Sequence, residues 1–221
     1  MQKKDELLAN SLLFGGLPAD QLRKIAELTV SKHYAKGATI FHEGDPGIGF
    51  YMVASGKVKI FKMSFDGKEQ ILHIFGPGEP FGEVPVFHGN PFPANAETLT
   101  EADIFFFPRT EFVALLSAHP SLALNMLAVL ALRLRRFATQ IENLSLKEVP
   151  GRLASYLRYL MEEQQRRDKV VLDIPKGQLA SLLGTSSETL SRIFNKMTEE
   201  GLIRVEGKTI FLLDSEGLKE R

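Results

Sequence analysis

Short apolar runs separated by turn-forming residues occupy the first half of the chain. The runs that resemble strands cover residues 39–41, 50–53, 57–63, 70–75 and 104–107. Glycine, proline, asparagine and aspartate cluster between them, most densely at residues 44–47 and 76–78. Because these residue types favour turns, the pattern predicts many short antiparallel strands folded into a sandwich or barrel.

A long helical pattern follows, from residue 121 to residue 147, without glycine or proline. Its apolar residues recur at alternating steps of three and four, which is typical of a coiled-coil seam. The seam consists of Leu127, Leu130, Leu134, Phe137, Ile141 and Leu144. A helix of this length spans roughly 40 Å, more than one barrel covers easily. We therefore predict that it pairs with the same helix of a second copy; the alternative is that the seam packs on its own domain.

The last third of the chain has another pattern, which begins after Pro150. It predicts a helix over 152–167, a strand over 170–174 and two short helices over 176–183 and 187–200. A hairpin over 202–206 and 209–213 completes it. Two helices joined by a short turn and followed by a hairpin are the outline of a winged helix-turn-helix. The predicted class is α+β, with a strand-rich domain at 1–118, a dimerisation helix at 119–147 and a DNA-binding domain at 148–221.

The second short helix of this motif has clear boundary signals. Gly184 suits the turn because it adopts positive φ without a Cβ clash. Ser186 suits the N-cap because its hydroxyl accepts from an unpaired N–H of the first turn. The buried stripe of the helix is predicted to be Leu190, Ile193, Phe194 and Met197.

This phase directs Glu188, Arg192 and Asn195 outward, with Ser187 and Ser191 at the flanks. Arginine bonds guanine in a bidentate manner, glutamate accepts from the cytosine amino group and serine bonds several bases. The alternative is a solvated face with an ordinary Glu188–Arg192 pair, but the adjoining turn and hairpin favour DNA. The predicted DNA-contacting residues are Lys176, Thr185, Ser186, Ser187, Glu188, Ser191, Arg192 and Asn195.

Composition narrows the other possibilities. The 27 basic and 27 acidic residues balance, so charge alone does not suggest DNA. The chain has no cysteine, which excludes disulfides, thiolate zinc sites and cysteine-ligated iron–sulfur clusters. No apolar run reaches the roughly 20 residues of a membrane span, and no signal-peptide core follows the first residues. We therefore expect a cytoplasmic protein without a membrane partner.

Three segments resemble the Crp–Fnr family of transcription regulators. They are HEGDPGIGFYMVASGKVKIF at 42–61, FGPGEPFGE at 75–83 and IPKGQLASLLGTSSETLSRIFNKMTEEGLIRVEGKTIFLL at 174–213. The resemblance implies a cyclic-nucleotide-binding-type β-roll before the long helix, a homodimer, double-stranded DNA and RNA polymerase as partners, and no enzymatic activity. The residues E-T-x-S-R at 188–192 are closer to the Fnr and Dnr branches, which implies a TTGA-containing inverted repeat. Ser187 stands where the cyclic-AMP receptor branch has a further base-reading arginine, so the outer bases stay open.

The resemblance also bears on the effector. In the cyclic-AMP receptor branch a Gly-Glu pair and a following Arg-Ser hold the ribose and the cyclic phosphate. This chain has Gly82 and Glu83, but Pro93 stands at the position of the arginine, and Phe137 and Ala138 replace the adenine-contacting pair. A cyclic phosphate needs a cation or backbone amides. We therefore do not expect cyclic AMP, we exclude the iron–sulfur switch for lack of cysteine, and we read Glu83 as a structural turn residue.

Two possibilities for the effector remain within the resemblance. One is haem-based nitric oxide sensing, as in Dnr-like relatives, and the other is another small effector. The candidate axial ligands are His33, His42, His73, His88 and His119. His73 is preferred because it lies in an apolar run, although an ordinary surface histidine is the alternative. The predicted effector pocket consists of His73, Glu83, Phe92, Leu130, Leu134 and Phe137.

Two rival classes fit the sequence less well. A cupin-type β-barrel enzyme needs clustered metal ligands such as His-x-His, and this chain contains no such motif. A ligand-binding module alone, like a kinase regulatory subunit, does not account for residues 150–213. Neither rival explains both halves of the chain.

Overall fold

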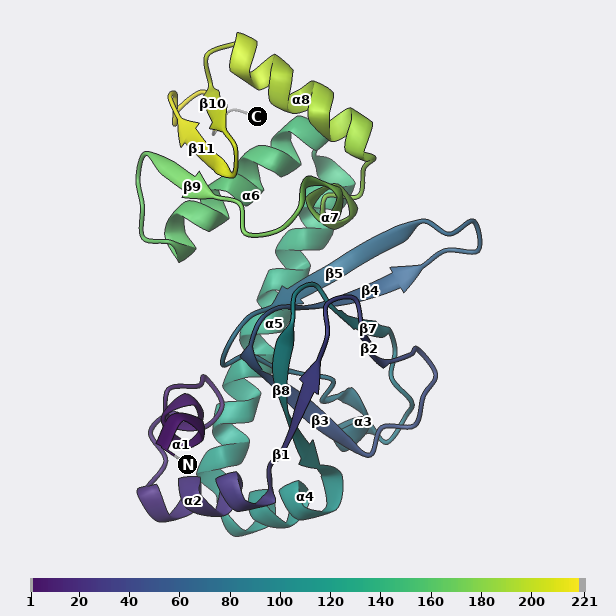
Figure 1. Cartoon of the computed structure of the whole chain (residues 1–221), viewed down its shortest axis with the longest axis vertical. Helices are drawn as coiled ribbons and strands as arrows, with labels where there is room; N and C mark the ends of the chain where they lie inside the picture. The colour runs from purple at the N-terminus through teal and green to yellow at the C-terminus, as the bar shows by residue number, and fades with distance from the viewer. Residues whose placement is uncertain (1, 219–221) are drawn as a thin grey trace. The chain divides into compact units, whose positions relative to one another are not determined.

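The computed structural model describes residues 2–218. It contains two compact units, Met1–Lys68 with Leu72–Leu134 and Glu69–Ile71 with Arg135–Arg221 (Figure 1). Helix α5 (Pro120–Leu146) begins in the first unit and ends in the second. Each unit is built around its own buried side chains.

The first unit is a β-roll of two four-stranded sheets, with strand orders β1-β8-β3-β6 and β2-β7-β4-β5 (Figure 1). The strands are β1 (Val30–Tyr34), β2 (Thr39–Phe41), β3 (Gly49–Ser55), β4 (Val58–Met63), β5 (Glu69–Phe75), β6 (Pro80–Phe81), β7 (Asn95–Thr98) and β8 (Ala102–Pro108). The helices are α1 (Gln2–Ala9), α2 (Ala19–Leu28), α3 (Val84–His88) and α4 (Arg109–Ala118). All five strands predicted from the sequence are confirmed, and β1, β6 and β7 are additional.

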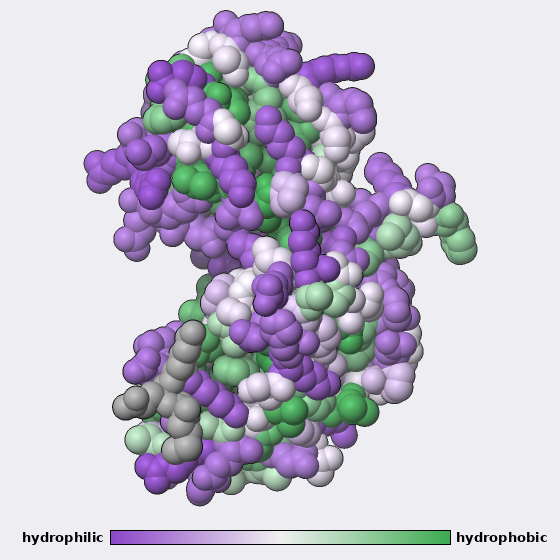
Figure 2. Space-filling view, in the orientation of Figure 1, coloured by the Kyte–Doolittle hydropathy of each residue, from purple (hydrophilic) through white to green (hydrophobic). Residues whose placement is uncertain are grey.

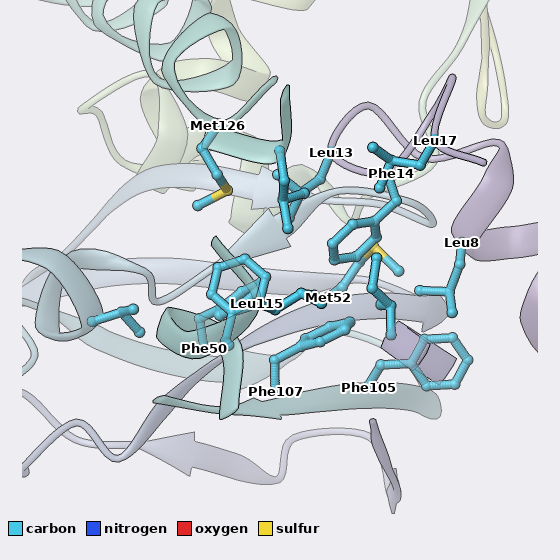
Figure 3. Packing of buried hydrophobic residues seen from close by; sticks show 14 residues of the cluster. Leu8, Leu13, Phe14, Leu17, Phe50, Met52, Phe105, Phe107, Leu115 and Met126 are labelled. Carbon is cyan, nitrogen blue, oxygen red and sulfur yellow. The ribbon is translucent and has the colours of Figure 1, made fainter. Parts of the chain in front are cut away.

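Leucine, methionine and phenylalanine side chains form one hydrophobic cluster of the first unit (Figure 3). The ring of Phe50 stacks on Phe107 with centroids 4.6 Å apart and meets Phe112 edge-on at 4.5 Å. Leu122 and Met126 from the first half of α5 belong to the same cluster. Since apolar burial contributes about 25 cal/mol per Å², these contacts hold the start of α5 on the roll.

A second aromatic cluster lies between the sheets. Phe92 stacks face to face on Phe41 at 3.8 Å, and Tyr51 and Phe81 extend the stack. Gly82 adopts φ +71°, and a Cβ at this position would approach Phe41 and Phe92 to 3.1 and 3.2 Å. Glycine at 82 therefore serves both the backbone conformation and the close aromatic packing.

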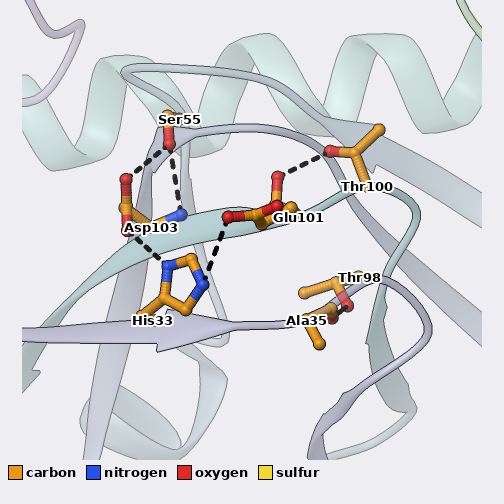
Figure 4. Close-up of polar contacts among 7 residues, drawn as sticks. All are labelled: His33, Ala35, Ser55, Thr98, Thr100, Glu101 and Asp103. Atoms are coloured by element: carbon orange, nitrogen blue, oxygen red, sulfur yellow. Dashed lines mark hydrogen bonds and ion pairs between the residues drawn. The ribbon is translucent and has the colours of Figure 1, made fainter.

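A polar network joins the edge strand β1 to β8 (Figure 4). His33 Nδ1 lies 2.9 Å from Asp103 Oδ1, and His33 Nε2 lies 3.4 Å from Glu101 Oε1. The Ser55 hydroxyl donates to Asp103 Oδ2 at 2.9 Å. The hydrogen bond to Asp103 raises the pKa of His33 above its ordinary value, and the nearby charges of Asp103 and Glu101 act in the same direction.

The second unit contains the helix-turn-helix and its wing. Its helices are α6 (Val149–Glu163), α7 (Lys176–Leu182) and α8 (Ser187–Glu199), and its sheet has the order β10-β11-β9. The strands are β9 (Lys169–Val171), β10 (Ile203–Glu206) and β11 (Thr209–Leu212). Every predicted element of this region is confirmed, although the helix before the motif ends four residues earlier and the first strand three residues earlier than predicted.

In the described part of the chain, no helix on its own has the length and apolarity of a membrane span; α4 and α5 reach them only jointly, across a 113° bend.

Candidate DNA-reading surface and effector region

The start of α8 is fixed by its N-cap. Ser186 has extended φ and ψ of −87° and 158°, and its hydroxyl accepts from the Thr189 N–H at 3.1 Å. Gly184 in the preceding turn has φ +65°. Both predictions are confirmed. Because the cap sets where helical geometry begins, it also sets which side chains of α8 point outward.

The outward face of α8 is polar. Leu190, Phe194 and Met197 are buried and Ile193 is half-buried, as predicted. The exposed residues of the predicted contact set are Ser186, Ser187, Glu188, Ser191, Arg192 and Asn195, to which Lys176 on α7 is added. In Figure 2 the surface over α8 is coloured mainly purple and white, in agreement with this phase. Thr185 is half-buried in the turn.

Glu188 is an acceptor in the first turn of this face. The hydrogen bond from its own backbone N–H is the largest cause that lowers the pKa of its carboxyl. The Ser186 hydroxyl and the charge of Arg192 lower the pKa further. The carboxylate is therefore ionised at neutral pH and accepts only, which suits the amino group of a base.

Lysines flank the motif on α7 and on the wing. Lys176 Nζ lies 5.0 Å from the centre of the Phe194 ring, a cation–π contact that holds the lysine beside α8. A cavity of about 240 Å³ lies between the start of α7 and the wing turn, and Lys176, Gly207 and Lys208 are among its lining residues. Lys208 was not among the predicted DNA residues. A basic residue in the turn of the wing hairpin was the signal that could have identified it.

The two stripes of α5 differ in burial. Leu122, Met126 and Val129 are buried. In the predicted seam Leu134 is 72% exposed and Ile141 64% exposed, Leu127 and Phe137 are also exposed, and Leu130 and Leu144 are half-buried. A single chain thus leaves most of the seam uncovered.

The predicted effector residues have different surroundings. His73 Nε2 lies 4.0 Å from Glu79 Oε1, and its ring meets Phe75 edge-on at 4.5 Å. Phe92 is buried in the aromatic cluster between the sheets, whereas Leu134 and Phe137 are exposed. In the same set Glu83 is buried, and His73 and Leu130 are half-buried.

Glu83 has a larger role than that of a turn residue. It does occupy the N-cap position of α3, but its buried carboxylate also accepts a hydrogen bond from Arg133 of α5. Arg133 was not predicted from the sequence. Its spacing of four and seven residues from Val129 and Met126, in the phase of the buried stripe, was the available signal.

Comparisons with known proteins agree with this geometry. Residues 31–119 match the family model described as a cyclic nucleotide-binding domain, and residues 151–221 match the Crp-like helix-turn-helix domain. The CRP-like cAMP-activated global transcriptional regulator of Mycobacterium tuberculosis is 33% identical over 221 residues, covering 98% of this chain and 99% of that protein. The cyclic AMP receptor protein of Thermus thermophilus is 32% identical over 213 residues. The alignment covers 96% of this chain and 97% of that protein.

Solved structures show the same fold. A CooA mutant from Carboxydothermus hydrogenoformans superposes with a TM-score of 0.78 at 23% identity, covering 98% of both chains. FixK2 from Bradyrhizobium japonicum superposes with a TM-score of 0.77 at 23% identity. The superposition covers 87% of this chain and 96% of the FixK2 chain. At these identities the likeness supports the fold only.

A cyclic-nucleotide-binding-type β-roll, a long helix and a Crp-like helix-turn-helix define a DNA-binding transcription regulator with a ligand-sensing domain. The chain belongs to the Crp–Fnr family of transcription regulators.

Proposed function

We propose that this protein is a homodimeric regulator that reads a TTGA-containing inverted repeat through α8. The observation that carries the proposal is the exposed polar face of α8, with Glu188 and Arg192 one turn apart beside the wing. We assign residues 1–118 to the sensor, 119–147 to the dimerisation helix and 148–221 to DNA reading. RNA polymerase is the proposed protein partner at the promoter, and we propose no catalytic activity.

Each exposed side chain has a proposed task. Arg192 bonds the guanine of TTGA through its N–H fork, and Glu188 accepts from the amino group of the cytosine paired with it. Ser187, Ser191 and Asn195 bond neighbouring base edges, whereas Thr185 and Ser186 at the start of the helix, with Lys176 and Lys208, hold phosphates. A symmetric dimer places two such helices about one helical turn of DNA apart.

The test of this function is binding to a duplex with the TTGA inverted repeat, measured by fluorescence anisotropy at fixed salt. We expect Arg192→Ala to weaken binding by about 1–3 kcal/mol and to relax discrimination at the guanine. Arg23→Ala, which removes an exposed arginine from α2, is the matched control and is expected to bind like the unaltered protein. An Arg192→Ala protein that still discriminates the site would contradict the direct-readout assignment.

The effector proposed here is a small molecule of the β-roll other than cyclic AMP. Support comes from Pro91 and Pro93, which offer no N–H to a phosphate, and from Glu83, whose carboxylate is engaged by Arg133. Cyclic AMP is the ligand to test first, because similar proteins are named as a cAMP-activated regulator and a cyclic AMP receptor. We expect millimolar cyclic AMP to leave the thermal unfolding midpoint unchanged, and an upward shift with tighter operator binding would overturn this inference.

Haem with His73 as axial ligand stays a hypothesis. His73 is partly exposed and its Nε2 lies toward the Glu79 carboxylate, so its geometry does not single it out as a ligand. Titration of the protein with haem, followed by the Soret band, tests the cofactor. A Soret shift that persists unaltered in His73→Ala would exclude His73 as the axial ligand. The absence of any Soret shift would exclude haem as the cofactor.

A further inference from the structure

Arg152 of α6 reaches the turn of the helix-turn-helix within the second unit. Its Nη1 donates to the carbonyl oxygen of Leu183 at 2.6 Å, although 31 positions separate the two residues. Arg152 lies in the first turn of α6, whereas Leu183 directly follows the last residue of α7. A single side chain therefore ties the start of α6 to the point at which α7 ends.

The backbone of this turn ends α7 in a Schellman motif. The N–H groups of Gly184 and Thr185 donate to carbonyl oxygens of α7 at 3.4 and 3.0 Å, and Gly184 has φ +65°. The Leu183 carbonyl takes part in neither of these two bonds, and the Arg152 guanidinium supplies its donor. The motif and the arginine thus act on neighbouring groups of one turn.

A positive charge suits this place in the fold. The last carbonyls of a helix carry partial negative charge, which a cationic side chain stabilises. The bond to Leu183 is charge-assisted and hence stronger than one from a neutral donor. A Cβ on Gly184 would lie 3.1 Å from Arg152 Nη1, so the guanidinium packs directly against the glycine of the turn.

The turn determines the direction in which α8 leaves it. Only Gly184 and Thr185 stand between Leu183 and the N-cap Ser186, so a change of the backbone at Leu183 is carried into the axis of α8. Asn195 lies about 12 Å along the helix from its start, and a tilt of about 10° displaces it by about 2 Å. Hydrogen bonds to base edges do not survive such a displacement, because donor and acceptor must stay within about 3.2 Å.

We propose that Arg152 is a positioning residue for DNA reading, whose bond to the Leu183 carbonyl holds α8 in one orientation relative to α6. This inference rests on the proposed function, because it adds to the reading surface of α8 a residue that does not itself touch DNA. Arg152 is half-buried and directed at a backbone carbonyl. It therefore acts on all base contacts of α8 together, whereas Arg192 acts on one base pair.

The test uses the full chain with Arg152→Gln, whose shorter side chain does not reach the carbonyl, and with Arg152→Lys, which keeps a charged donor. Arg158→Gln is the matched control because it makes the same change on an exposed residue of the same helix. Anisotropy with the TTGA repeat and with a scrambled duplex, each over a series of salt concentrations, reports DNA binding. Hydrogen–deuterium exchange at residues 183–186 reports the turn, and thermal unfolding reports global stability.

We expect Arg152→Gln to weaken binding to the repeat about tenfold and to change the affinity for the scrambled duplex less than about twofold. The slope of log K against log salt should stay as in the unaltered protein, because no phosphate contact is lost. Exchange at 183–186 should be faster than in Arg158→Gln at temperatures well below unfolding. Arg152→Lys should recover part of the affinity, since its ammonium group still donates to a carbonyl.

Three results would overturn the proposal. A salt slope reduced by about 1 would make Arg152 a phosphate contact. Equal losses on the two duplexes, or exchange at 183–186 equal to that of Arg158→Gln, would remove its positioning role. If Arg152→Gln does not fold, the same criteria apply to Arg152→Lys. Failure of the unaltered protein to prefer the repeat would instead refute the proposed function, and exchange at 183–186 would still decide whether Arg152 holds the turn.

Discussion

At the residue scale, the protein holds charged groups with short local contacts. The Glu188 carboxylate is stabilised by its own backbone N–H and by the Ser186 hydroxyl at the start of α8. The helix dipole also favours a negative charge there. His33 uses the neighbouring strand, since Asp103 is its direct register partner in the β1–β8 ladder. Both arrangements keep the group ionised at a pH at which it would otherwise lose part of its charge.

The pH dependence of His33 follows from its partners. Folding raises the pKa of His33, so the contact stabilises the fold below the ordinary histidine pKa and this contribution is lost as pH rises through the raised value. In Asp103→Asn we expect the titration midpoint of the His33 ring to fall, as followed by NMR. Asp20→Asn, on α2, should leave the midpoint unchanged, and an unchanged midpoint in Asp103→Asn would contradict the assignment.

Lys208 gives a second prediction at this scale. A lysine that neutralises one phosphate contributes to affinity without regard to sequence. We expect Lys208→Ala to weaken binding to specific and scrambled duplexes alike and to reduce the slope of log K against log salt by about 1. An unchanged slope would place Lys208 outside the phosphate contacts.

At the element scale, the helices and strands with strong local sequence signals were predictable and those that depend on pairing were not. The elements of the helix-turn-helix were predicted within a few residues because Gly184 and Ser186 mark the boundary and the apolar period is regular. Strand β1 was missed because it lies at a sheet edge with little burial, and β6 because it has two residues. Their conformation depends on pairing with β8 and β3, which no local pattern records.

The functional residues also differ in how far local sequence predicts them. The outward face of α8 was predicted correctly because a cap and a helical period define it within one element. The Glu83–Arg133 pair joins residues 50 positions apart, so only the tertiary fold reveals it. The same reason explains why Phe92, predicted for a pocket, lies in the aromatic core.

Helix α5 supports a direct test of the dimer seam. Leu134→Asp places a charge on the exposed seam, and we expect it to shift the protein from dimer to monomer in sedimentation velocity. Leu132→Asp is the matched control, because Leu132 is also exposed but lies on the opposite side of α5 from the seam. Dimers that withstand Leu134→Asp, or that dissociate equally with Leu132→Asp, would refute the seam.

At the scale of the whole molecule, one polypeptide combines a cyclic nucleotide-binding domain with a Crp-like helix-turn-helix domain. The family models cover the β-roll and the helix-turn-helix separately, and α5 provides the covalent link between them. In the proposed dimer, DNA binding by a symmetric pair of α8 helices would depend on how α5 meets its copy, so we expect changes far from α8 to alter affinity.

DNA reading by α8 is tested by comparing the affinity for a TTGA inverted repeat with that for a scrambled duplex of equal length, at one salt concentration. We predict that the unaltered protein prefers the repeat by about 10³-fold or more, and that Arg192→Ala loses most of this preference while retaining binding to the scrambled duplex. Equal affinity of the unaltered protein for the two duplexes, or an undiminished preference in Arg192→Ala, would contradict it.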